Sequence, residues 1–90
     1  MAALEDYTMT QDFKLGTEVY RIRNSDRLVM KVRAVDAVHE LMSRLSAAQY
    51  PSRMDIAMAL AAGEVLTAGG FTYAWHLSNV VGFEAERKRA

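Results

Sequence analysis

Two segments in the first half of the chain alternate between apolar and polar residues. Residues 18–23 and 28–33 both repeat with period two, and residues 24–26 between them are Asn, Ser and Asp, which favour turns. This pattern predicts a β-hairpin. Its core face is expected to carry Tyr20, Ile22, Leu28, Met30 and Val32. Because opposed residues share a face, Ile22 and Met30 can both be internal only if the loop holds an odd number of residues, so we expect a three- or five-residue loop.

The other face of the predicted hairpin concentrates positive charge. It is expected to point Arg21, Arg23, Lys31 and Arg33 to water. The chain as a whole has a formal net charge of zero, so this face would be a local basic patch. It has two interpretations, a site for phosphates or an acidic protein, or an ordinary solvated sheet face whose charges discourage aggregation.

Helical periodicity follows the hairpin. Residues 34–48 carry a stripe of apolar residues at helical spacing, which are Val35, Val38, Leu41, Met42 and Leu45. A second helix is expected to begin after Ser52, because Ser52 and Asp55 have the spacing of a capping box, and to end at Gly63. Residues 49–51 are then a short connection, which makes the two helices neighbours.

The second helix offers another candidate binding surface. Met54 and Met58 are separated by four positions and share one helical face, with Arg53 at the start of the helix. Flexible methionine side chains suit adaptable protein contacts, and they fill hydrophobic cores equally well. We therefore name Arg53, Met54 and Met58, together with the four basic hairpin residues, as candidate partner-binding residues.

A second hairpin is predicted around Ala68-Gly69-Gly70, which is a strong turn signal. Residues 64–67 precede it, and residues 71–77 then alternate, so that one face holds Phe71, Tyr73, Trp75 and Leu77. Three interpretations of this aromatic row are open: the core face of the hairpin, a stacking surface for bases, or an anchor for a protein partner. The first is favoured because a small domain needs large side chains in its interior. Val80, Val81 and Phe83 are candidates for an additional edge strand.

The predicted element order is ββααββ, which indicates a single small α+β domain with two helices packed on an antiparallel sheet. We expect the domain to span residues 17–83, with an N-terminal arm at 1–16 and a charged C-terminal tail at 84–90. The chain has 90 residues, too few for a second hydrophobic core.

Composition excludes several classes of function. The chain has no cysteine, and therefore no disulfide, thiolate metal site or cysteine nucleophile. His39 and His76 do not have the spacing of metal ligands, and His39 is expected to be partly buried beside the apolar stripe. No serine, threonine or lysine lies in a motif that would activate it. We therefore expect no catalysis and no cofactor. The absence of disulfides, of a membrane span and of a basic signal-peptide start favours a cytoplasmic setting.

One segment resembles a known family in part. Residues 51–75, with Pro51-Ser52, Gly63, Ala68-Gly69-Gly70 and Trp75, are similar to small DNA-binding repeats appended to phage homing nucleases. The resemblance implies a helix-turn-helix with a β-wing and DNA contact through the second helix. However, this helix carries mainly alanine and methionine where base-reading polar residues would be needed.

Taken together, these patterns favour a non-enzymatic interaction protein, such as a regulator, inhibitor or subunit, that binds a larger protein or a second copy of itself. The alternative is a small DNA- or RNA-binding regulator that uses the basic hairpin face or the helix pair. A membrane partner is not expected.

Overall fold

A four-stranded sheet and two helices form the two layers of this protein. The computed structural model describes residues 17–80, and the predictions for 1–16 and 81–90 lie outside these residues. The elements are β1 (Glu18–Arg23), β2 (Leu28–Arg33), α2 (Ala34–Met42), α3 (Arg53–Ala61), β3 (Leu66–Ala68), β4 (Phe71–Ala74) and the short 3-10 helix η1 (Leu77–Asn79). The predicted α+β class and the order ββααββ are confirmed.

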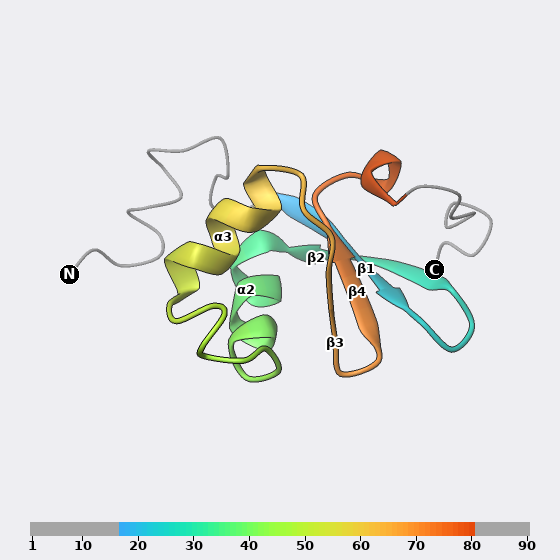
Figure 1. Cartoon of the computed structure of the whole chain (residues 1–90). Helices are drawn as coiled ribbons and strands as arrows, with labels where there is room; N and C mark the ends of the chain where they lie inside the picture. The colour runs from blue at the N-terminus through green and yellow to red at the C-terminus, as the bar shows by residue number, and fades with distance from the viewer. Residues whose placement is uncertain (1–16, 81–90) are drawn as a thin grey trace.

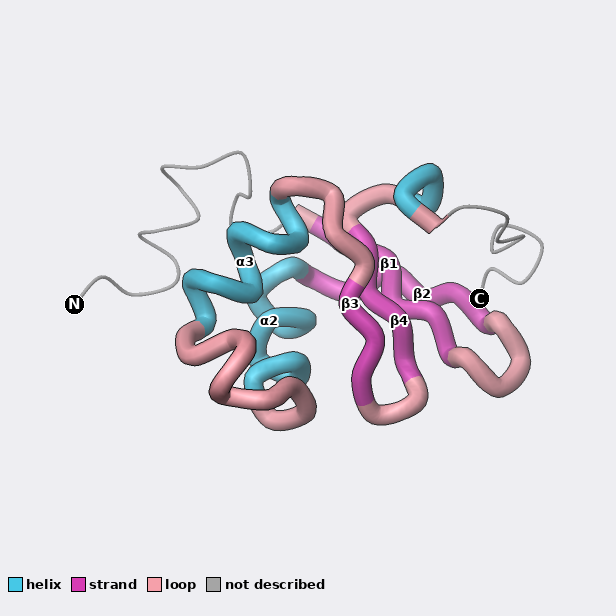
Figure 2. Tube along the Cα trace, in the orientation of Figure 1, coloured by secondary structure: helices cyan, strands magenta, loops and turns pink. Residues whose placement is uncertain are grey.

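All strand pairs in the sheet are antiparallel, and the spatial order is β2-β1-β4-β3. The two hairpins therefore meet along β1 and β4, and the helix pair connects β2 of the first hairpin to β3 of the second. Both helices cover one face of the sheet, while η1 lies on the other side (Figures 1 and 2).

The register of the first hairpin differs from the prediction. Ile22 is opposite Val29, and Arg21 is opposite Met30, so Ile22 and Met30 lie on different faces of the sheet. The loop holds an even number of residues, Asn24 to Arg27, and Arg27 closes it with a φ of 64°. The predicted odd-length loop is therefore wrong.

The side chain of Asp26 stabilises this loop. Its Oδ1 accepts the backbone N–H of Leu28 at 3.1 Å, and its two oxygens accept from the guanidinium of Arg23 at 3.0 and 2.8 Å. The N–H of Arg27 also donates to the carbonyl of Arg23 at 2.7 Å. These bonds accompany the pairing that opposes Ile22 and Val29.

Both faces of the sheet bury apolar side chains, which explains why alternation misassigned the register. On the helix side, Val19, Leu66 and Tyr73 join the main core with α2 and α3. On the other side, Ile22 and Val29 form a second cluster, and Tyr20, Leu77 and Val80 pack against it. When both faces of a sheet bury apolar residues, the alternation of apolar and polar positions does not determine the register of a strand pair.

The first helix is shorter than its apolar stripe predicts. It ends at Met42, and the Ser43 hydroxyl donates to the carbonyl of Glu40 at 2.8 Å. The carbonyl of Ser46 then accepts from the N–H groups of Gln49 and Tyr50 in a separate turn. Serine side chains offer the backbone such local alternatives to the helix. The connection between the helices is consequently longer than predicted, although Leu45 still packs against the core.

The termini of α3 agree with the sequence. The Ser52 hydroxyl accepts from the N–H of Asp55, and the Asp55 carboxylate accepts from the N–H of Ser52, which completes the predicted capping box. After the helix, Gly63 has a φ of 93° and donates to the Leu60 carbonyl, while Glu64 donates to Ala59. These two bonds make a Schellman motif, the usual reason for glycine at this position.

The second hairpin turns at Gly69 and Gly70, both at positive φ, as the sequence predicts. Phe71, Tyr73 and Trp75 pack against the helix-side core, which confirms the favoured interpretation of the aromatic row. Leu77 belongs to the opposite cluster instead, because the strand ends at Ala74 before the alternation does. Val80 follows η1 rather than lying in a strand.

The main core includes α2 residues Ala34, Ala37, Val38 and Leu41, and α3 residues Ile56, Ala57, Ala59 and Leu60. The small alanines allow the two helices to approach closely. Within residues 17–80, no helix is long and apolar enough to cross a membrane.

Candidate interaction surface

The structure divides the predicted basic face between two sides of the sheet. Arg21 and Arg23 lie on the side of the helices, whereas Lys31 and Arg33 lie on the other side. This follows directly from the observed register, in which Arg21 opposes Met30 and Lys31 opposes Tyr20. The four residues therefore do not form one patch, and the expectation that all four point to water is wrong for Arg21, which is half-buried.

Three of these four cations are already paired with carboxylates. Arg23 contacts Asp26 at 2.8 Å, Arg33 contacts Asp36 at 2.9 Å, and Arg21 contacts Glu40 at 2.7 Å. Because of the hydrogen bond from Arg23, the pKa of Asp26 is lowered to about 2. Lys31 instead lies over the ring of Tyr20 with its Nζ 5.9 Å from the centroid. Of the four, Lys31 is the one whose charge no carboxylate within residues 17–80 neutralises.

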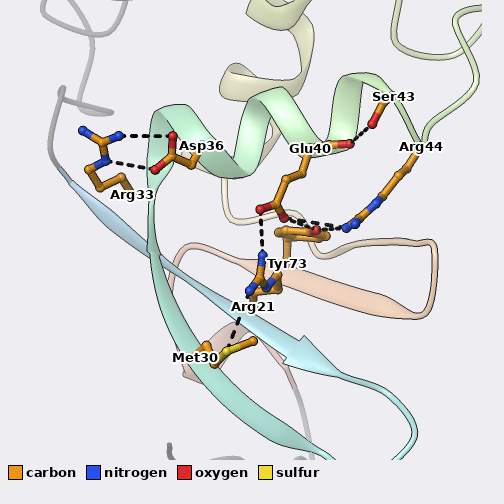
Figure 3. Close-up of polar contacts among 8 residues, drawn as sticks. All are labelled: Arg21, Met30, Arg33, Asp36, Glu40, Ser43, Arg44 and Tyr73. Carbon is orange, nitrogen blue, oxygen red and sulfur yellow. Dashed lines mark hydrogen bonds and ion pairs between the residues drawn. The ribbon is translucent and has the colours of Figure 1, made fainter.

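A polar network fastens α2 to the sheet (Figure 3). Glu40 on α2 accepts from Arg21 Nη1 of β1 at 2.7 Å and from the Tyr73 hydroxyl of β4 at 2.6 Å. Arg44, just after α2, donates to the Tyr73 hydroxyl and lies 3.6 Å from Glu40. Both guanidinium groups also lie near the ring of Phe71, at 5.3 and 5.2 Å from its centroid. The network thus joins three elements through one carboxylate.

The protonation states in this network are stable around neutral pH. Burial alone would raise the pKa of Glu40, but the hydrogen bonds from Tyr73 and Arg21 and the nearby positive charges lower it overall. Burial and the hydrogen bond to Glu40 raise the pKa of Tyr73 to about 12. Glu40 is therefore a carboxylate and Tyr73 a neutral phenol, and neither is poised to exchange a proton near neutrality. We assign the network a structural role.

Sequence reasoning missed this network, although two signals were present. Glu40 and Arg44 are separated by four positions, the spacing of a helical ion pair. Tyr73 was expected in the core, and a buried tyrosine hydroxyl needs a hydrogen-bond partner. What the sequence lacked was the position of Arg21, because its partner Glu40 is far away in the chain.

The outer face of α3 is the second candidate surface, and it is apolar. Met54 is 40% exposed and Met58 is 52% exposed, while Ala61 and Ala62 at the end of the helix are also exposed. The opposite face of the same helix is buried in the core. Beyond its charged first turn, α3 thus carries apolar residues on both faces, a composition typical of helices covered on both sides. The third exposed large apolar residue among residues 17–80 is Val65, which follows the helix.

Of the candidate residues of α3, Met54 and Met58 share the outer face of the helix, four positions apart. Arg53, Met54 and Met58 are all exposed, and Arg53 begins the helix. In contrast, His39 is exposed, so the expectation of a partly buried histidine is wrong. Residues 17–80 contain no group of three histidine, aspartate or glutamate side chains that could hold a metal ion.

These observations identify α3 as the surface whose character is not explained by the fold. Large apolar side chains of α3 are exposed, and its side-chain hydrogen bonds belong to the N-terminal cap. In contrast, Arg21, Arg23 and Arg33 of the hairpin form ion pairs within the domain. Comparisons of the chain with protein-family models, with curated proteins and with solved structures gave no match.

Proposed function

We propose that this protein works by binding another polypeptide through the outer face of α3, and that it acts as a regulator, inhibitor or subunit rather than as an enzyme. The observation that carries the proposal is the exposure of Met54 and Met58 on a helix whose other face is already in the core. A polar outer face would be expected if this helix only covered the sheet.

The energetic scale of the methionine contact is modest. Burial of a whole methionine side chain contributes roughly 1.5–3 kcal/mol, and about half of each side chain is still accessible here. Methionine also adapts its shape to a partner, because it is unbranched and has a polarisable sulfur. Met54 and Met58 are therefore suitable central contacts, with Arg53 as a charged residue at the rim.

Nucleic-acid binding is the weaker alternative. A phosphate-binding surface needs several cations free to replace counterions. Here Arg21, Arg23 and Arg33 are each paired with a carboxylate, and the four basic hairpin residues occupy opposite faces. The exposed part of α3 offers Arg53 but no series of base-reading side chains. A cytoplasmic location accords with the cysteine-free composition and belongs to the same proposal.

Site-specific photocrosslinking in cells tests the proposal. A photoreactive amino acid placed at Met58 should form covalent adducts with protein, and the mass of each adduct identifies the polypeptide. The matched control carries the same photoreactive residue at Ser25, which is exposed in the loop between β1 and β2.

Protein adducts that form at position 58 and not at position 25 would support the proposal. Equal labelling at both positions, or no protein adduct at position 58, would contradict it. Adducts with nucleic acid from a photoreactive residue at Lys31, together with steeply salt-dependent binding to duplex DNA or RNA, would favour the alternative.

A further inference from the structure

Within residues 17–80, the outer side of β2 is an open edge of the sheet. The strand order β2-β1-β4-β3 places β2 at one side, where β1 is its one neighbour in this part of the chain. The Ala34 N–H donates to the Thr17 carbonyl at 2.6 Å. Because hydrogen-bonded pairs alternate along an antiparallel ladder, Met30 then directs its backbone groups toward β1. The N–H and carbonyl groups of Val29 and Lys31 therefore point away from β1, to the open edge.

The side chains of β2 define which sequence would fit beside it. On the η1 side, Lys31 and Arg33 are two positions apart and both exposed. Lys31 has no carboxylate partner within residues 17–80, and Arg33, although paired with Asp36, keeps 62% of its side chain exposed. The helix side of β2 carries three half-buried apolar residues, Leu28, Met30 and Val32. A matching strand would alternate apolar residues with acidic ones two positions apart.

The chain contains such a sequence directly after the described residues. Residues 81–86 are Val, Gly, Phe, Glu, Ala and Glu, so apolar residues alternate with Gly82, Glu84 and Glu86. Val80, the last described residue, packs against a cluster that includes Val29 of β2. Neighbouring strands lie about 4.8 Å apart, and an extended residue spans about 3.3 Å. The segment can therefore reach the open edge of β2 within a few residues of Val80.

We propose that residues 81–86 bind along the open edge of β2 as a fifth strand, parallel to β2. The direction follows from the position of Val80, since the segment enters at the Val29 end of β2. The strand pairs with the open backbone groups of β2 and protects this edge from pairing with another chain. The contact lies in the sheet and not on α3, so the inference is independent of the proposed function.

Charge selects the register of the fifth strand. Glu84 lies beside Lys31, and Phe83 lies on the helix side, over the half-buried apolar residues of β2. Glu86, two positions further on, lies beside Arg33. A shift by two residues in either direction would keep the two faces, but it would leave a single acidic residue beside a cation. The proposed register is therefore the one that pairs both carboxylates.

Engineered disulfides test the register, since the chain has no cysteine of its own. Residues side by side on adjacent strands are close enough for a disulfide. Lys31→Cys/Glu84→Cys should therefore form an intramolecular disulfide on mild oxidation, which intact mass spectrometry detects. The matched control is Thr67→Cys/Glu84→Cys, because Thr67 is exposed on the same face at the opposite edge of the sheet. Arg33→Cys/Gly82→Cys should stay reduced, since only an antiparallel strand would bring these two positions together.

Amide hydrogen exchange measured by NMR tests the backbone pairing. The Lys31 N–H, which faces the open edge, should be protected in the unmodified chain. Phe83→Pro removes a backbone donor from the fifth strand, so the Lys31 N–H should exchange at least about tenfold faster in this variant. The Val32 N–H faces β1 and should exchange slowly in both chains, which shows that the domain is folded. Arg89→Pro, outside the segment, is the control and should change neither rate.

A disulfide that forms faster in Lys31→Cys/Glu84→Cys than in the Thr67 control, together with a protected Lys31 N–H, would support the fifth strand. Equal rates of disulfide formation, or a Lys31 N–H that exchanges freely in the unmodified chain, would overturn it. A disulfide in Arg33→Cys/Gly82→Cys would contradict the parallel direction. None of these results depends on photocrosslinking from position 58, so the α3 surface and the fifth strand stand or fall separately.

Discussion

The hydroxyl of Tyr73 donates a hydrogen bond to Oε1 of Glu40 at 2.6 Å, and this bond joins β4 to α2 across the interface of sheet and helix. The two residues are far apart in sequence, and each also contacts Arg44. Glu40 in turn reaches Arg21 on the central strand. The orientation of α2 on the sheet therefore depends on a few polar groups as well as on the apolar core.

Replacing Tyr73 with phenylalanine should lower the free energy of unfolding by about 1–2 kcal/mol at neutral pH, because Glu40 and Arg44 both lose a partner in a half-buried setting. The ring itself remains in the core. Urea denaturation measures the change. Tyr50→Phe is a control, since that tyrosine is half-buried without a hydrogen bond to this network.

Tyr73→Phe should also change how the free energy of unfolding depends on pH in the alkaline range. The pKa of Tyr73 is raised to about 12 in the folded protein, above the ordinary value of 10.0. The neutral Tyr73 hydroxyl therefore contributes its full stabilisation to the folded state below the unfolded pKa. This stabilisation is lost as the pH rises from about 10 to about 12. The stability gap between the unmodified chain and Tyr73→Phe should shrink over this range, and a constant gap would contradict the shifted pKa.

Glu40→Gln should reduce the acid sensitivity of the fold. The pKa of Glu40 is lowered in the folded state, so its stabilising effect is present above the unfolded pKa and is lost as the pH falls through the folded pKa. The variant should be less stable than the unmodified chain at neutral pH, and the two should converge at low pH. Chemical denaturation at a series of pH values tests this, and parallel curves would argue against it.

Reversing the charge of Arg21 should have a much larger effect than reversing that of Lys31. Arg21 is paired with Glu40 at 2.7 Å in a half-buried position, and a glutamate there would place two carboxylates side by side. We expect a loss of about 2–4 kcal/mol for Arg21→Glu and of at most about 0.5 kcal/mol for the exposed Lys31→Glu. Equal effects in thermal melts would contradict the observed register.

The helix pair supplies a test of the core. Leu41 of α2 and Leu60 of α3 are both fully buried in the main cluster. Truncation of either to alanine should cost about 2–5 kcal/mol, a large share of the stability of so small a domain. Met58→Ala serves as the exposed control and should cost far less. Urea melts with losses below about 1 kcal/mol for both leucines would be incompatible with this packing.

Removal of the α3 cap is expected to destabilise the domain without altering its fold. Ser52→Ala deletes the hydroxyl that accepts from the N–H of Asp55, at a cost of about 1 kcal/mol. Ser52→Thr keeps a hydroxyl that can accept from this N–H and donate to the Asp55 carboxylate, so it should recover most of the loss. Thermal melts compare the two variants, and a fully stable Ser52→Ala would show that the cap is dispensable.

The sequence by itself determined the features that depend on near neighbours. The capping box joins Ser52 and Asp55, three positions apart, and the turn at Gly69 and Gly70 needs only the backbone freedom of those two residues. The apolar spacing likewise identified Leu41 and Leu60 as core positions and predicted the order ββααββ. The exposed methionines of α3 could also be nominated from their spacing.

Only the tertiary structure decided how the strands pair and where the charges lie. Alternation tells which residues of one strand share a face, but it does not tell which residue of the next strand lies opposite. Here the loop around Asp26 set that pairing, and apolar clusters on both faces made either side acceptable for Ile22. Arg21 was consequently carried to the helix side, where Glu40, distant in the sequence, neutralises it. Contacts between distant residues depend on the register and packing of the whole domain, which no local pattern encodes.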